Sequence, residues 1–163
     1  MAITYQKILF CTDFSEDADY AFLTALDMAE KYQARLIIFH VLHSPYKYMR
    51  SVVDEPALGG EETFISPEVI EKIIKNLKER YESKMGDFRQ YEFHAVVGVP
   101  FVEIVRFSRA EDVDFIVLGA AGSSDLDRVT FGSTAENVAR RAHCTVMAIR
   151  YPEKSFQLDK IGK

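Results

Sequence analysis

The 163-residue sequence has few cysteines, no long hydrophobic run and no excess of positive charge. Its two cysteines, Cys11 and Cys144, match the spacing of no metal or redox motif. We expect both to be buried, reduced thiols, with a disulfide or a reactive thiol as the alternatives. No apolar run approaches the roughly 20 residues of a membrane-spanning helix, so we expect no membrane association. The formal net charge of −5 argues against a nucleic-acid-binding protein, which normally has a basic face.

Recognisable targeting and catalytic signatures are also missing. Residues 1–7 lack the order of charged and apolar residues that makes a signal peptide, so we expect a cytoplasmic protein. The phosphate-binding pattern G-x-x-x-x-G-K-[ST] does not occur. No carboxylate or cysteine completes a metal site around the four histidines at a recognisable spacing, and we expect those histidines to be structural.

Apolar runs alternate with amphipathic segments along the whole chain. The strand-like runs are residues 7–12, 35–41, 92–97, 115–118 and 145–149, and the helical segments are 15–32, 67–81, 100–111 and 133–141. Near-continuous apolar strands indicate a parallel sheet covered on both faces. Right-handed crossovers then predict a doubly wound α/β domain. The third strand is the least apolar, so we place it near an edge of the sheet.

Two regions fall outside this regular pattern. Residues 1–151 are expected to form one domain, interrupted by a long connection at 42–65 that is either a cover for a ligand or a surface loop. Residues 152–163 are polar and mixed in charge, and they are expected to be a frayed end or a contact with a partner subunit.

A glycine-rich stretch follows the fourth strand. Gly119 and Gly122 are three residues apart, and Gly132 precedes Ser133 and Thr134 at the start of a helix. Glycine lets a backbone approach a phosphate closely, and a helix N-terminus offers free N–H groups to an anion. In open α/β sheets, ligands bind beyond the carboxyl ends of the strands where the strand order reverses. The connections after the first and fourth strands meet there, so the sequence predicts a nucleotide site.

The first of these connections carries Asp13, which has two interpretations. It either caps the first helix as part of a capping box with Glu16, or it holds a ribose hydroxyl or a metal ion on a phosphate. Ser133 and Glu136 are spaced in the same way, so Ser133 either caps its own helix or donates to a phosphate.

Together these residues resemble the universal stress protein family from Lys7 to Arg150. The resemblance rests on Thr12-Asp13-Phe14-Ser15, His40-Val41, Gly98-Val99-Pro100 and Gly119-x2-Gly122-x9-Gly132-Ser133. The last pattern is typical of the family's ATP-binding branch. The resemblance implies a Rossmann-like, five-stranded parallel sheet in the order 3-2-1-4-5, a homodimer paired through residues 145–149, and a bound adenine nucleotide.

The resemblance also assigns roles to residues. Asp13 would hold the ribose or a Mg²⁺ ion on the phosphates, the backbone of Val41 would read the adenine, and the glycine loop would line the ribose and phosphates. The implied cofactor-binding set is Thr12, Asp13, Val41, Leu118, Gly119, Gly122, Gly132, Ser133 and Thr134.

The glycine loop departs from the family in its charge. Ala121 replaces a common His or Arg, and Asp125 and Asp127 occupy a usually basic stretch in which Arg128 is the only cation. Carboxylates repel a triphosphate. Either Mg²⁺ neutralises the repulsion, or ATP binds weakly, or the ligand has fewer phosphates.

Three functions are therefore weighed. The intact glycine pattern favours an adenine-nucleotide-binding regulatory protein of the stress response. A slow ATPase or nucleotidyl-transfer enzyme is the second, although phosphoryl transfer needs positioned cations. The third is a nucleotide-free dimeric module that acts through partners. A dimer is expected in each case because an apolar edge strand at residues 145–149 needs a partner.

Overall fold

Five parallel strands form the centre of the molecule in the order β3-β2-β1-β4-β5. This computed structural model describes residues 2–44, 66–121 and 131–152. The strands are β1 (Lys7–Cys11), β2 (Arg35–His43), β3 (Tyr91–Gly98), β4 (Phe115–Gly119) and β5 (Thr145–Ile149). The predicted doubly wound sheet and its strand order are confirmed, and the weakly apolar third strand lies at an edge as expected.

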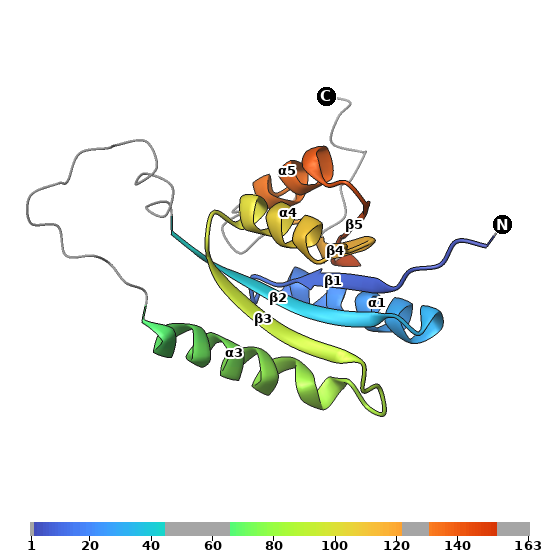
Figure 1. Ribbon diagram of the computed structural model, residues 1–163, viewed down its shortest axis with the longest axis horizontal. Helices are drawn as coiled ribbons and strands as arrows, with labels where there is room; N and C mark the ends of the chain where they lie inside the picture. Colours follow the sequence, from blue (N-terminus) through green and yellow to red (C-terminus); the bar gives the residue numbers. More distant parts are fainter. Residues whose placement is uncertain (1, 45–65, 122–130, 153–163) are drawn as a thin grey trace, which may run out of the picture.

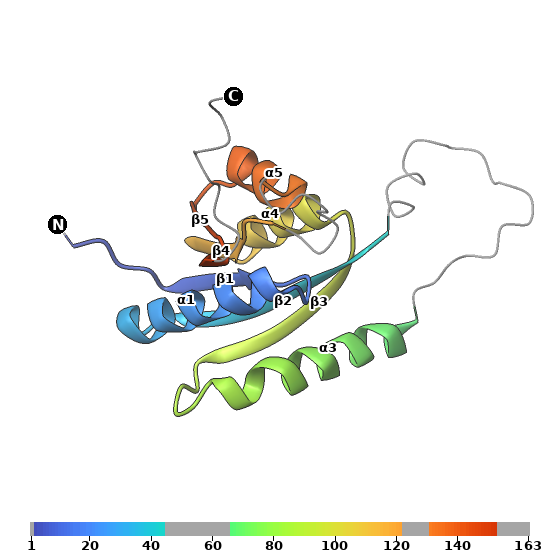
Figure 2. The ribbon, with the colours of Figure 1, turned by 180° about the vertical axis from the view of Figure 1, so that it is seen from behind.

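Helices cover both faces of the sheet. They are α1 (Glu16–Tyr32), α3 (Pro67–Tyr81) with the short 3-10 turn η1 (Glu82–Lys84), α4 (Pro100–Ala110) and α5 (Ser133–Arg141). Figure 1 shows α1 and α3 on one side of the sheet and α4 and α5 on the other, and Figure 2 shows the same layers from behind. Right-handed crossovers between parallel strands place consecutive helices in this way.

Local sequence signals set the helix ends. Ser15 is the N-cap of α1, and its hydroxyl accepts a hydrogen bond from the N–H of Ala18 at 3.2 Å. α1 ends at Gln33, which adopts the left-handed conformation with φ of 54°. Proline stands at the first position of both α3 and α4, where its missing N–H is of no consequence.

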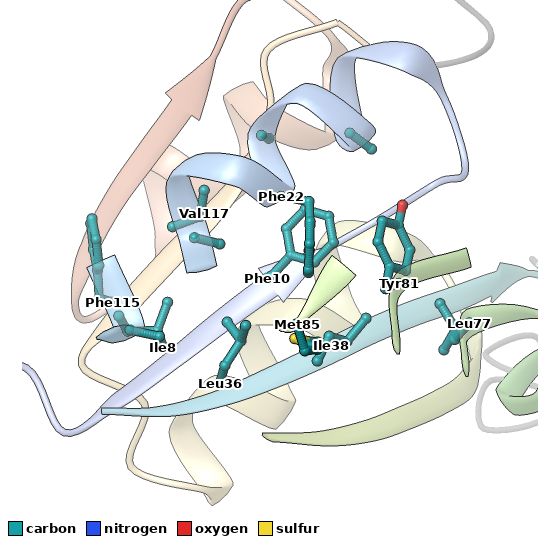
Figure 3. Packing of buried hydrophobic residues seen from close by; sticks show 14 of the residues in the cluster. Ile8, Phe10, Phe22, Leu36, Ile38, Leu77, Tyr81, Met85, Phe115 and Val117 are labelled. Carbon is teal, nitrogen blue, oxygen red and sulfur yellow. The ribbon is translucent and has the colours of Figure 1, made fainter. Parts of the chain in front are cut away.

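Strand alternation divides the core into two layers. In β1, Ile8 and Phe10 face α1 and α3, whereas Leu9 and Cys11 face α4 and α5. The α1/α3 layer is rich in rings: Phe10 lies against Phe22 and Tyr81 with ring centroids 5.4 Å apart in both pairs. Figure 3 shows this cluster between the helices and the sheet. The sheet is therefore buried on both sides, as its apolar strands require.

Two sequence-based expectations need adjustment. β2 and β3 run beyond their predicted ends, because their pairing continues to His43 and Gly98 and the N–H of Ser44 then donates to the carbonyl of Gly98. Neither cysteine forms a disulfide, but only Cys11 is buried and Cys144 is half-buried. Burial raises the pKa of both thiols. None of the helices in the described part of the chain is long and apolar enough to cross a membrane.

Candidate functional site

A cavity of about 580 Å³ opens at the carboxyl ends of β1, β2 and β4. Its volume is in the range of small-molecule sites. The N-terminal ends of α4 and α5 form its other walls. It lies between β1 and β4, where the strand order reverses, which is the position predicted from the sequence.

The structure brings the predicted site residues together around this cavity. Those that line it are Thr12, Asp13, Val41, Leu118, Gly119, Gly132, Ser133 and Thr134. The remaining member of the set, Gly122, lies outside the described residues, as do Asp125, Asp127 and Arg128. The long connection at 42–65 is described only up to Ser44, and the segment to which both interpretations apply, a cover for a ligand or a surface loop, lies outside the described residues.

The turn after β1 presents Asp13 at the cavity. Its carboxylate is exposed, and Oδ1 accepts a hydrogen bond from the N–H of Ser15 at 3.0 Å. The helix-capping interpretation of Asp13 is wrong, because Ser15 is the residue that caps α1. The carboxylate orders the turn locally while it faces the cavity.

His40 supports the same turn from β2. Its Nδ1 lies 2.8 Å from the carbonyl oxygen of Thr12, so Nδ1 carries the proton and donates. Burial lowers the pKa of His40, although the Thr12 carbonyl and the charge of Asp13 act in the opposite direction. The net effect is to favour the neutral imidazole beside the cavity.

Gly119 ends β4 in close contact with α1. A Cβ at this position would lie 3.1 Å from the backbone carbonyl carbon of Asp17 and 3.2 Å from the backbone nitrogen of Ala18. Few real Cβ atoms approach their neighbours so closely, and the first turn of α1 would have to shift by a few tenths of an ångström to accept one. Gly119 thus suits the close packing of α1 on the sheet, a reason that is independent of any ligand.

The start of α5 faces the cavity. Gly132 is its N-cap, no side chain caps it, and the N–H of Gly132 donates to the carbonyl of Ala120 at 2.7 Å. The interpretation of Ser133 as the cap is therefore wrong, because Ser133 is already the first helical residue. A helix N-terminus carries partial positive charge and free N–H groups, which suit an anion.

Sequence reasoning missed the wall supplied by α4. Val99, Pro100, Phe101 and Ile104 line the cavity, but none of them belongs to the set of site residues predicted from the sequence. The signal was available in principle, because Pro100 opens a helix directly after a parallel strand whose carboxyl end lies at the same edge of the sheet. Asn137 on α5 was also missed, and its place on the wall depends on how α5 packs on α4.

The described wall of the cavity carries little positive charge. Within residues 2–44, 66–121 and 131–152, the lining includes no Lys or Arg, one carboxylate at Asp13, and two histidines, His40 and His43. The described residues also contain no cluster of three or more His, Cys, Asp or Glu that could hold a metal ion. In this described wall, positive potential comes from the N-termini of α4 and α5.

The fold and the position of the cavity define a doubly wound α/β domain with a ligand site at its topological switch point. The profile of the universal stress protein family matches residues 4–150, and the chain belongs to this family. A curated relative, universal stress protein MJ0531 of Methanocaldococcus jannaschii, is 32% identical over 155 residues, which cover 92% of this chain and 85% of that protein.

Solved structures share the fold. Protein MJ0577 superimposes with a TM-score of 0.71 and 23% identity, covering 96% of this chain and 99% of that one. A universal stress protein in complex with cAMP has a TM-score of 0.61, 24% identity and coverage of 90% and 98%. One from Archaeoglobus fulgidus in complex with dAMP has a TM-score of 0.58, 22% identity and coverage of 90% and 99%. At these identities the likeness concerns the fold alone.

Proposed function

We propose that this protein binds an adenine nucleotide of the ATP type in the cavity and acts as a cytoplasmic regulator of the stress response. The observation that carries the proposal is the convergence of the predicted residues on one cavity, which has the N-terminus of α5 in its wall. Two proteins of the same fold form complexes with cAMP and dAMP, which supports the class of ligand.

Each part of the nucleotide has a proposed place. The phosphates lie at Ser133 and Thr134, where N–H groups and hydroxyls gather at the start of α5. The ribose lies against Asp13, and the adenine edge pairs with the backbone of Val41 at the end of β2. Leu118 and Gly119 form the floor between them. Thr12 contributes to the wall, and Gly122 belongs to the proposed phosphate loop.

The charge of the wall bears on the number of phosphates. Asp13 repels phosphates and the described lining has no Lys or Arg to offset it. We expect ATP to bind tightly only with Mg²⁺, which Asp13 would help to hold, and AMP to bind independently of Mg²⁺. Isothermal titration with ATP, ADP, AMP and cAMP, each with and without Mg²⁺, measures this directly, and GTP is the control for the base.

The first experiment is native mass spectrometry of freshly purified protein, followed by identification of any small molecule that denaturation releases. One adenine nucleotide per subunit would support the proposal and give its phosphate count. A nucleotide-free mass, unchanged by ATP with Mg²⁺, would overturn it and favour a module that acts through protein partners. Turnover of ATP that Asp13→Asn abolishes would instead favour an enzyme.

We also propose a homodimer formed through β5. Thr145 is exposed and the other four residues of the strand are half-buried, at an edge that has no neighbour in the described chain. A second copy of the strand, antiparallel across a twofold axis, would satisfy the free backbone groups. A monomeric mass at micromolar concentration in light scattering would contradict this.

A further inference from the structure

The turn after β1 is held from the side of the sheet opposite the cavity. The cavity is walled by α4 and α5, and no residue in the described α3 lines it. Nevertheless the last two residues of α3, Arg80 and Tyr81, reach across to the turn that carries Asp13. Figure 3 shows Tyr81 within the α1/α3 core with its hydroxyl directed toward the connection between β1 and α1.

A chain of hydrogen bonds links the turn to Asp19 of α1. The Tyr81 hydroxyl donates to Oδ1 of Asp19 at 2.9 Å. Its single proton is then used, so the hydroxyl of Thr12, 2.6 Å away, must donate to the oxygen of Tyr81. The Thr12 oxygen in turn accepts from the N–H of Phe14 at 3.0 Å. The backbone after Asp13 is thus connected to a buried tyrosine.

Arg80 forms a second connection to the turn. Its Nη2 donates to the carbonyl oxygen of Phe14 at 2.9 Å, and its Nε donates to Oδ1 of Asp19 at 2.8 Å. Its guanidinium also lies over the ring of Phe14, 5.8 Å from the centroid. Burial alone would raise the pKa of Asp19, but the hydrogen bonds from Arg80 and Tyr81 outweigh it and hold that pKa below its ordinary value.

The conformation of the turn requires such support. Phe14 has φ of 63°, in the left-handed region that residues other than glycine seldom occupy. A strained residue of this kind persists where its surroundings over-determine it. Here the Phe14 carbonyl is held by Arg80, the Thr12 hydroxyl by Tyr81 and the Thr12 carbonyl by His40. Asp13 lies between these anchors and faces the cavity.

We propose that Arg80 and Tyr81 are positioning residues of the nucleotide site, an inference that rests on the proposed function. They fix the backbone on both sides of Asp13, and so the carboxylate meets the ribose or metal ion already oriented. Because both residues end α3, the seating of this helix on the sheet is coupled to nucleotide affinity.

The test uses Tyr81→Phe, which removes only the bridging hydroxyl, and Arg80→Met, which keeps the aliphatic stem. We expect each to raise the Kd for AMP by about five- to tenfold, the effect of losing one well-placed hydrogen bond. In the nucleotide-free protein, amide exchange at Phe14 should accelerate in both variants. Arg80→Lys retains the positive charge but loses the planar guanidinium with its several N–H donors, and it should raise the Kd by a smaller factor than Arg80→Met.

The matched control is Ile73→Val, which lies on the same helix and in the same core but whose side chain has no group that could hydrogen-bond to the turn. It should lower the unfolding temperature while the Kd and the exchange rate of Phe14 stay at wild-type values. If Tyr81→Phe and Arg80→Met also lower the unfolding temperature without changing the Kd or the exchange rate of Phe14, then Tyr81 and Arg80 have a structural role only and the proposal is overturned. Wild-type protein that binds no adenine nucleotide would overturn the proposed function and this coupling together, whereas an unchanged Phe14 exchange rate would overturn the coupling alone.

Discussion

The two faces of the sheet differ in what fills them. The face under α1 and α3 is packed with rings, among them Phe10, Phe22 and Phe115, all 1% exposed or less. The face under α4 and α5 has fewer rings, chiefly Phe39 stacked on Phe107, among smaller side chains such as Leu9 and Val138, and the end near the carboxyl ends of the strands is left open as the cavity. One sheet therefore supports a closed layer on one side and a binding layer on the other.

Away from the turn after β1, the difference separates stability from binding in space. Large aromatic side chains fill the ring-rich layer along its length. This layer therefore contributes to the stability of the fold mainly by burying apolar area. In the other layer, residues such as Ile104 and Leu118 belong to the core and to the cavity wall at once. Substitutions on the two faces should therefore have different signatures, which four predictions examine in order of effect.

The largest effect is expected in the ring-rich layer. Phe115 is 1% exposed, stacks on Tyr5 with ring centroids 4.6 Å apart, and lies at the amino end of β4, away from the cavity. Phe115→Ala should lower the free energy of unfolding by about 3–5 kcal/mol and leave the nucleotide Kd unchanged. Urea denaturation and titration calorimetry measure the two. Ile104→Ala, on the other face, should raise the Kd, and equal effects of both variants on the Kd would remove the distinction between the faces.

The next effect belongs to Gly119, where the two layers meet. Gly119→Ala should cost roughly 1–3 kcal/mol, because its methyl group must displace the first turn of α1. It should also raise the nucleotide Kd, since Gly119 lies in the cavity floor.

Gly86→Ala provides the matched control for Gly119. Gly86 has φ of 57° but open space around its Cβ position, so alanine there should cost only about 1 kcal/mol and leave the Kd unchanged. A Gly119→Ala variant as stable as wild type would show that α1 shifts to accept the methyl group without a cost in stability, which would contradict this prediction.

Asp13→Asn should weaken nucleotide binding and leave stability almost unchanged, whereas Phe115→Ala should do the reverse. The asparagine oxygen can still accept from the N–H of Ser15, so the turn is kept and the unfolding temperature should change by only about 1 °C. The Kd for ATP with Mg²⁺ should rise roughly tenfold, because a charged acceptor is lost. Asp87→Asn, at another exposed carboxylate, is the control. Tighter binding of ATP by Asp13→Asn would mean that Asp13 only repels the phosphates.

The smallest effect concerns pH. The folded-state pKa of His40 lies below its ordinary value of 6.5 because of burial, so the unfolded chain takes up the proton first. The stability that this histidine contributes is complete above pH 6.5 and is lost as the pH falls through the lower folded pKa. His40→Gln should make the unfolding temperature less dependent on pH by roughly 1–2 °C in this window. An unchanged slope in His40→Gln would contradict the prediction.

Most of the fold could be predicted because its signals are local. The apolar runs and the helix-opening prolines Pro67 and Pro100 gave nearly every element, and the rules for parallel sheets placed the site at the carboxyl ends of the strands. Of the two interpretations left open at Asp13 and Ser133, capping failed because several residues before each helix can act as the N-cap, and a glutamate three residues on does not choose among them. Ser15 and Gly132 took those positions instead.

What could not be predicted depends on contacts between distant segments. The hydrogen bond between Thr12 and Tyr81 joins residues 69 positions apart, and the close approach of Gly119 to Asp17 depends on how α1 lies on β4. Neither has a periodicity or a motif in the sequence. Both contacts shape the turn and the floor of the cavity. The sequence therefore predicts the residues that line the cavity but not the long-range contacts that hold them in place.

The central place of β1 has a consequence for biosynthesis. β1 pairs with β2, which follows it closely in the chain, but its other edge receives β4, so that Ile8 pairs with Phe115. As the chain leaves the ribosome, amino end first, that edge of β1 has no native partner until residue 118 has been made. The cavity needs β4 and the start of α5 together, and so an incomplete chain has part of its core before it has any ligand pocket. The growing chain therefore acquires the ability to bind only after strands β1 to β4 and the start of α5 have been made.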